Sequence, residues 1–224
     1  MECRKGREGE MEFDPTANHA IRNRLRRLTH NKLIAFSASC CEQLLPDYES
    51  FVQHNRRGDV TPLRCALDRI WVHLGGAPLA LHEAESLLDG CDAVAPERAG
   101  VDDSEEPGNR LARNAVDAVC DTLGSCVERG RNAAQTSARR AIDSALSHLR
   151  SRASEGLQRA DSDPHRDPLV LGELRRQLDV VTVLEMVDDP SPSFLAGLRA
   201  SARIRGGEAT PTRLQGEEGT ATLR

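Results

Sequence analysis

The sequence predicts an all-α fold, a single compact bundle of about seven or eight helices with disordered termini. Apolar residues recur at spacings of three and four through most of the chain, which is the period of a helix with one buried face. Prolines, glycines and polar caps divide this pattern into segments of helical length. Only Val180–Leu184 has strand propensity, and we expect a helix there because it continues a longer helical pattern.

Both ends of the chain predict disordered tails. Residues 1–13 and 206–224 are polar and glycine-containing, and they hold too few apolar side chains to offset the entropy lost on ordering. Residues 14–205 should therefore form one all-helical domain. This length is sufficient for a single buried core.

The first two helices are predicted from start signals followed by apolar stripes. Asp14-Pro15 supplies a cap and a proline at the first helical position. Thr29 or Asn31 can cap the second helix, whose wide apolar stripe covers residues 33–45. A stripe of this width indicates a helix that is covered on several sides, so we expect it at the centre of the fold.

Proline and glycine mark the next boundaries. Pro46 should end or restart the second helix, because the residue before a proline avoids the helical region. Thr61-Pro62 opens a third helix that closes at Gly75-Gly76, and residues 79–89 form a short amphipathic helix. Residues 89–109 are rich in Gly, Pro, Asp and Glu, and they predict a mobile acidic connection within the domain.

The second half predicts four more helical segments. Residues 111–128 form one, which Gly130 interrupts, and an alanine-rich stripe over residues 134–149 forms another that would allow close packing. Residues 171–187 form a strong helix after two prolines. Ser191 can cap a last short helix near residues 194–198.

The charge pattern argues against a nucleic-acid partner. The net charge is −5, and residues 33–124 carry sixteen acidic against seven basic side chains. Four arginines between Arg22 and Arg27 could contact nucleic acid or an acidic partner, but no aromatic residues interleave with them for base stacking. We favour a solvated face that pairs with the acidic middle of the same chain.

Cysteine usage is typical of a reducing compartment. There are seven cysteines, two of them adjacent at Cys40-Cys41, and no Cys-x-x-Cys occurs. No apolar segment resembles a signal peptide or is long enough to cross a bilayer. We therefore expect a cytoplasmic protein without a membrane partner.

The most informative candidates for a metal or ligand site are acidic residues on the second and third helices. The group formed by Cys41-Glu42 with Asp68 and His73 could bind a metal between facing helices, but the Glu-x-x-His pair of helical metal sites does not occur. A local ion pair with Arg64, four residues away on the same helix, also explains the presence of Asp68. We favour the structural reading and expect no metal and no cofactor.

Three further residues of the same stretch have two readings each. Cys41 is either a reactive thiol or core packing, and we favour packing because Glu42 would raise the thiol pKa. Asp59 is either a helix cap or the mouth of a small-molecule pocket, and the cap is favoured by Thr61-Pro62. Trp71 is either core or one wall of a ligand pocket, and its place on an apolar stripe favours core.

The order of motifs resembles an uncharacterised bacterial family typified by YjaG. The resemblance covers roughly residues 20–206 and implies a compact all-helical cytoplasmic protein, but no activity and no catalytic residue. The chain departs from the family at Glu105–Asn109, which are polar here. The motifs are Phe36-x3-Cys40-Cys41-Glu42-x3-Pro46-x-Tyr48-x2-Phe51, Gly58-Asp59, Leu67-Asp68-x2-Trp71, Ala115-Val116-Asp117-Ala118, Pro168-Leu169-Val170-x2-Glu173 and Gly197-Leu198-Arg199-Ala200.

Two functions remain open from the sequence. The first is a non-enzymatic interaction or regulatory module that binds a protein partner or a second copy of itself, and an exposed apolar patch would favour it. The second is an enzyme or a small-ligand or metal-binding protein, with a pocket near Cys41, Glu42, Asp59, Asp68 and Trp71. We favour the first, because no catalytic signature is recognisable.

Overall fold

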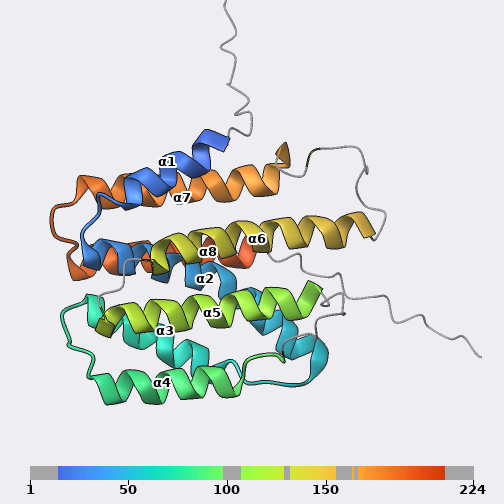
Figure 1. Cartoon of the computed structure of the whole chain (residues 1–224), viewed down its shortest axis with the longest axis horizontal. Helices are drawn as coiled ribbons and strands as arrows, with labels where there is room; N and C mark the ends of the chain where they lie inside the picture. Colours follow the sequence, from blue (N-terminus) through green and yellow to red (C-terminus); the bar gives the residue numbers. More distant parts are fainter. Residues whose placement is uncertain (1–14, 98–106, 129–131, 155–162, 164–165, 210–224) are drawn as a thin grey trace, which may run out of the picture.

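The computed structural model of the protein describes residues 15–97, 107–128, 132–154, 163 and 166–209. In these ranges the chain forms eight α-helices and no strand, which confirms the predicted all-α fold. The proposed Asp14 cap, residues 1–13 and residues 210–224 lie outside the described ranges. The helices are α1 (Pro15–Leu25), α2 (His30–Asn55), α3 (Thr61–Leu74), α4 (Leu81–Ala93), α5 (Pro107–Glu128), α6 (Ala133–Ser154), α7 (Pro168–Met186) and α8 (Pro192–Ala209) (Figure 1).

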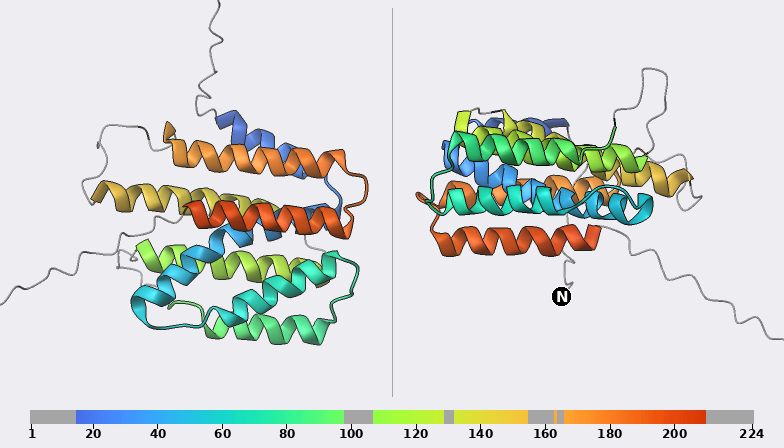
Figure 2. Two further views of the ribbon diagram at one scale, coloured as in Figure 1. Left: turned by 180° about the vertical axis from the view of Figure 1, so that it is seen from behind. Right: turned by 90° about the horizontal axis from the view of Figure 1, so that it is seen from below.

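Helix α2 is the central element of the bundle, as its broad apolar stripe predicts. It contacts α3, α5, α6, α7 and α8. Figure 2 shows that α8 forms an outer layer by itself, on the side of α2 opposite α5 and α6. One face of α8 therefore packs on α2, while the opposite face is exposed.

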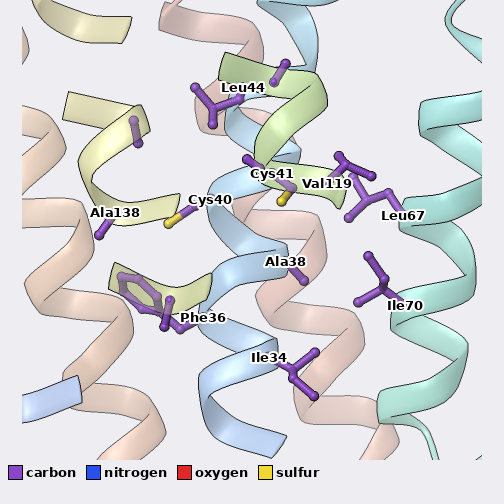
Figure 3. Packing of buried hydrophobic residues seen from close by; sticks show 14 of the residues in the cluster. Ile34, Phe36, Ala38, Cys40, Cys41, Leu44, Leu67, Ile70, Val119 and Ala138 are labelled. Carbon is purple, nitrogen blue, oxygen red and sulfur yellow. The ribbon is translucent and has the colours of Figure 1, made fainter. Parts of the chain in front are cut away.

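The core is built around side chains of α2. Phe36 and Tyr48 are completely buried, and the adjacent Cys40 and Cys41 point to different neighbours, α6 and α5 respectively (Figure 3). The buried face of α6 is rich in alanine, and these small side chains allow α6 to pack closely against α2, as the sequence predicts. The buried residues drawn and labelled in Figure 3 are Ile34, Phe36, Ala38, Cys40, Cys41, Leu44, Leu67, Ile70, Val119 and Ala138.

The predicted break at Pro46 is wrong, because α2 continues through this residue to Asn55. A proline inside a helix removes the hydrogen bond from its own nitrogen, here to the carbonyl of Glu42, and its ring crowds that carbonyl. The flanking Leu45 and Asp47 are buried, so tertiary packing holds the helical conformation despite the local cost. Thr29 does lie at the N-cap position of α2, but its side chain makes no capping hydrogen bond.

Several other boundaries differ from the prediction. Helix α4 extends to Ala93, and Cys91 in its last turn is buried, with Sγ 3.8 Å from the carbonyl oxygen of Pro62. The connection between α4 and α5 is therefore shorter than the predicted residues 89–109, and residues 98–106 of it lie outside the described ranges. Helix α8 is longer than predicted and passes the expected domain limit at residue 205.

Two predicted caps are confirmed, and Arg24 does not make the surface pairing predicted for its cluster. The backbone N–H of Thr61 donates to Asp59 Oδ1 over 2.8 Å, and the N–H of Phe194 donates to Ser191 Oγ over 3.2 Å. Arg24 of the basic cluster pairs with Glu185 on α7 at 2.6 Å, not with the acidic middle of the chain. The reason is topological, because α1 packs beside α7.

Candidate functional site

The carboxylate of Glu42 lies at the junction of α2, α3 and α8, and its side chain is fully buried. From α3, Arg64 Nη1 donates to it at 2.7 Å and Trp71 Nε1 at 3.1 Å. From α8, Arg199 Nε donates at 2.8 Å and Arg203 Nε at 3.0 Å. Four donors thus satisfy one buried carboxylate, which offsets its desolvation.

Asp68 completes this cluster from the exposed side. Arg199 donates to Asp68, and Arg203 Nη2 lies 3.5 Å from Asp68 Oδ1. The guanidinium of Arg199 also lies 5.8 Å from the centre of the Trp71 ring, within the range of a cation–π contact. We call Glu42, Arg64, Asp68, Trp71, Arg199 and Arg203 the Glu42 cluster.

The Glu42 cluster ties α8 to the rest of the bundle. The sequence indicated a local ion pair between Arg64 and Asp68. In the structure Arg64 donates to Glu42, and Asp68 pairs with the arginines of α8. Next to Glu42, Gln43 Nε2 donates to the backbone carbonyl of Ala202 over 3.1 Å. Side chains of α2 therefore hold α8 through both its arginines and its backbone.

The structure brings together three of the five predicted site residues and places two elsewhere. Glu42, Asp68 and Trp71 share the Glu42 cluster. Cys41 lies on another face of α2, where its Sγ is 3.4 Å from Thr122 Oγ1 of α5. Asp59 caps α3 and lines a separate cavity of about 600 Å³ beside Phe51, Val94 and Asn109.

The adjacent thiols are core groups. Cys40 and Cys41 are completely buried, and burial raises the pKa of both. The charge of Glu42 raises the pKa of Cys41 further, as the sequence suggested, although burial is the larger cause. Both side chains are therefore protonated at neutral pH and have no thiolate for nucleophilic chemistry.

A cleft not anticipated from the sequence lies between α2, α7 and α8. Its volume is about 380 Å³, within the roughly 300–1,000 Å³ typical of small-molecule pockets. Most of its lining is apolar, and Val183 is 40% exposed at its edge. We call it the α2–α7–α8 cleft, and its lining residues are Gln43, Arg176, Asp179, Val180, Val183, Phe194, Gly197, Leu198, Ser201 and Ala202.

Arg176 is the one charged residue of this lining that is buried, with 5% of its surface exposed. Its Nε and Nη2 donate to the two oxygens of Glu173 at 2.8 and 2.7 Å, and Nη2 lies 3.4 Å from Cys40 Sγ. Its Nη1 is buried and has no hydrogen-bond partner. Burial by itself would lower the pKa of Arg176, but the Glu173 carboxylate raises it above the usual value.

Sequence reasoning missed Arg176, although a signal for it exists. Glu173 and Arg176 are three residues apart, a spacing that pairs side chains on a helix. Both precede Gln177 in a helix whose other inward positions are leucine and valine. A paired acid and base on the apolar stripe of a helix predicts a buried ion pair, but the cleft beside it depends on where α8 packs.

A second buried carboxylate, Asp47, joins α2 to α6. His148 Nε2 lies 2.7 Å from Asp47 Oδ1, and the hydroxyl of Ser144 donates to Asp47 Oδ2. The residue types are those of a hydrolase triad, but here the carboxylate is the shared partner of both other groups. In a triad the histidine accepts from the nucleophile, whereas Ser144 donates to Asp47. The arrangement is typical of a structural hydrogen-bond network that joins two helices.

The described residues hold no cluster of three or more His, Cys, Asp or Glu side chains that could ligate a metal. His73, which the sequence paired with Glu42 and Asp68, instead lines a different cavity with His30 and Cys126. Among the same residues, no helix combines the length and apolar character needed to span a bilayer.

Comparison with known proteins identifies the family and the fold. A model of the DUF416 family, described as a protein of unknown function, matches residues 20–208. The crystal structure of a DUF416 family protein from Shewanella baltica OS155 is similar, with a TM-score of 0.68 and 20% sequence identity over 80% of this chain and 91% of that one. No curated protein matches the chain. The match over nearly the whole helical region shows that the chain belongs to the DUF416 family of proteins of unknown function.

Proposed function

We propose that this protein is a non-enzymatic binding module whose binding site is the α2–α7–α8 cleft. The observation that carries the proposal is a mainly apolar cleft of about 380 Å³ whose wall includes Arg176, a buried cation with one unpartnered donor. Concave apolar sites with a few convergent polar groups are the usual sites of small-molecule binding.

The chemistry of the other polar clusters supports binding over catalysis. Glu42 accepts from four donors, and Asp47 accepts from two. A carboxylate engaged in this way is a poor general base, because abstracting a proton would break contacts that hold its charge. Burial keeps Cys40 and Cys41 as thiols.

The Glu42 cluster has a supporting role in this proposal. It fixes α8, and α8 supplies half of the cleft lining, from Phe194 to Ala202. Arg199 and Arg203 bind Glu42, while Leu198 and Ala202 line the cleft. The residues that the sequence singled out thus hold one wall of a site that lies beside them.

Binding of an environment-sensitive apolar dye tests the proposal. We expect one dye molecule to bind each chain, and Gly197→Leu to abolish binding by filling the cleft. A Cβ at Gly197 would meet nothing within 4 Å, so the substitution adds volume without a clash in a helix. Gly172→Leu is the matched control, because Gly172 is also a helical glycine with open space but lies outside the cleft lining.

The outcomes of the dye experiment are distinct. Loss of binding in Gly197→Leu with retention in Gly172→Leu supports the proposal. Absence of dye binding to the parent protein, or equal binding to all three proteins, overturns it. Thermal unfolding of both variants verifies that each is folded.

A macromolecular partner is the second candidate, and exposed apolar side chains on α7 favour it. Val183 is 40% and Met186 80% exposed, and they lie three residues apart on one helical face next to the cleft. Sedimentation of the purified protein distinguishes self-association through this face, which Met186→Glu would prevent, from a monomer with a ligand cleft.

We also infer that the protein works in the cytoplasm of a bacterium and is YjaG-like within its family. The motif order in the first half of the chain supports the relationship. The six cysteines of the described ranges are all free, which is consistent with a reducing compartment.

A further inference from the structure

We propose that the ligand of the α2–α7–α8 cleft is a small apolar molecule with one uncharged hydrogen-bond acceptor, such as an amide, ester or ketone carbonyl, which accepts from Arg176 Nη1. The proposal rests on the function proposed above and adds the chemical class of the ligand. Three features carry it: an unused donor, the charge balance around that donor, and the apolar walls.

The unused donor lies on the free side of the guanidinium. Glu173 occupies the edge formed by Nε and Nη2, and Cys40 Sγ takes a further contact from Nη2. Nη1 is therefore the group of Arg176 that remains for a new partner, and it is buried without one. A buried N–H without an acceptor is unfavourable, and a ligand carbonyl would supply the missing partner.

The charge balance selects an uncharged acceptor over a carboxylate. The positive charge of Arg176 is already balanced by Glu173, which contacts it with both oxygens. Asp179 also lines the cleft, so Arg176, Glu173 and Asp179 together carry a net negative charge. A carboxylate ligand would place a further negative charge there, whereas a carbonyl accepts the same hydrogen bond without that repulsion.

The apolar walls define the rest of the ligand. Val180 and Val183 of α7 face the cleft together with Phe194 and Leu198 of α8. The polar Ser201 and Asp179 are exposed, so they lie where the cleft meets solvent. An alkyl or aryl body between the two helices, with its carbonyl at Arg176, matches this distribution of apolar and polar surface.

Competition by a matched series of ten-carbon probes tests the ligand class. Decanamide, decanoate and decyltrimethylammonium share one alkyl body and differ in the head group. Each is titrated at pH 7.5 against the dye bound to the full-length protein. We expect decanamide to displace the dye with an affinity about tenfold or more above that of decanoate, because both can accept from Arg176 but only decanoate adds a negative charge to the cleft.

Variants of the ion pair separate Arg176 from the apolar walls. Arg176→Met is combined with Glu173→Gln, so that no unpaired charge is left buried. We expect this double variant to bind decanamide about tenfold more weakly because the donor is lost, while dye binding shows that the cleft persists. Arg176→Lys is the second variant, since it keeps the charge but lacks the planar second nitrogen, and its affinity for decanamide should be intermediate.

The outcomes separate this inference from the function on which it rests. If the dye binds and Gly197→Leu blocks it, but decanoate or the cation binds as tightly as decanamide, the ligand class is wrong and the binding function stands. An affinity for decanamide that is unchanged in both Arg176 variants also overturns the inference. If the dye does not bind to the cleft, the proposed function itself fails.

Discussion

The indole Nε1 of Trp71 donates to Glu42 Oε1 over 3.1 Å, and this bond joins the single tryptophan of the chain to a buried carboxylate with four donors. Trp71 is only 7% exposed, which confirms its predicted place in the core. The same carboxylate binds arginines of α3 and α8. A core residue and a charged cluster therefore meet at one point, where three helices are held together.

Replacement of Glu42 tests the importance of this junction. We expect Glu42→Gln to lower the free energy of unfolding by about 3 kcal/mol, because three arginines lose their shared counter-charge while part of each remains buried. Urea unfolding measures the change. Glu49→Gln is the control, since the Glu49 side chain is 40% exposed and lies 3.5 Å from Arg64, and its cost should be at most about 1 kcal/mol. Equal effects of the two substitutions would contradict the account.

Two substitutions of Trp71 separate its volume from its hydrogen bond. Trp71→Phe keeps an aromatic ring but removes the donor to Glu42, and we expect a cost of about 1–2 kcal/mol. Trp71→Ala also creates a cavity and should cost about 3–5 kcal/mol. Denaturant unfolding followed by circular dichroism gives both values. A Trp71→Ala protein as stable as the parent would show that this side chain does not support the core.

The glycines at two left-handed positions give a matched test of crowding. Gly58 has φ +91°, and a Cβ there would lie 2.8 Å from the hydroxyl of Tyr48, which donates to the Val94 carbonyl. Gly76 has φ +104° with nothing within 4 Å. Both alanine substitutions should cost about 1 kcal/mol of backbone strain, and Gly58→Ala should cost measurably more because Tyr48 must move. Equal losses in melting temperature would exclude the contact with Tyr48.

The buried thiols predict a loss of stability at high pH. Because the pKa of Cys40 and of Cys41 is raised in the folded protein, the unfolded chain releases these protons first. Their contribution is therefore complete below the unfolded pKa of about 8.5 and is lost as pH rises above it, by up to about 1.4 kcal/mol per pH unit for each thiol.

Unfolding by urea between pH 7.5 and 10 measures this dependence. The double variant Cys40→Ala/Cys41→Ala should have a shallower decline than the parent, although it is less stable at pH 7.5. Parallel declines would show that these thiols ionise alike in the folded and unfolded chain.

Much of the fold follows from local patterns. The apolar stripe of residues 33–45 predicts the position of α2, and capping chemistry predicts Asp59 and Ser191. The error at Pro46 has a non-local cause, because packing around α2 outweighs the local preference of the residue before a proline. Local signals thus identify the helices, while their exact ends depend on tertiary contacts.

The candidate site was harder to predict because its parts are distant in sequence. The partners of Glu42 on α8 lie more than 150 residues away, so no spacing rule connects them. The α2–α7–α8 cleft depends on the distance at which α8 packs from α7, which is a property of the folded bundle. Only the Glu173–Arg176 pair was visible as a local signal.

Titration of methyl-labelled protein with decanamide tests most directly whether a small apolar molecule with an uncharged acceptor occupies the α2–α7–α8 cleft. We predict saturable shifts of the methyl resonances of Val180, Val183 and Leu198, which line the cleft, and no shifts in Gly197→Leu. Resonances of Leu67 and Ile70, buried between α2, α3 and α5, serve as an internal reference. Absence of shifts, or shifts centred away from the three cleft residues, would contradict the account.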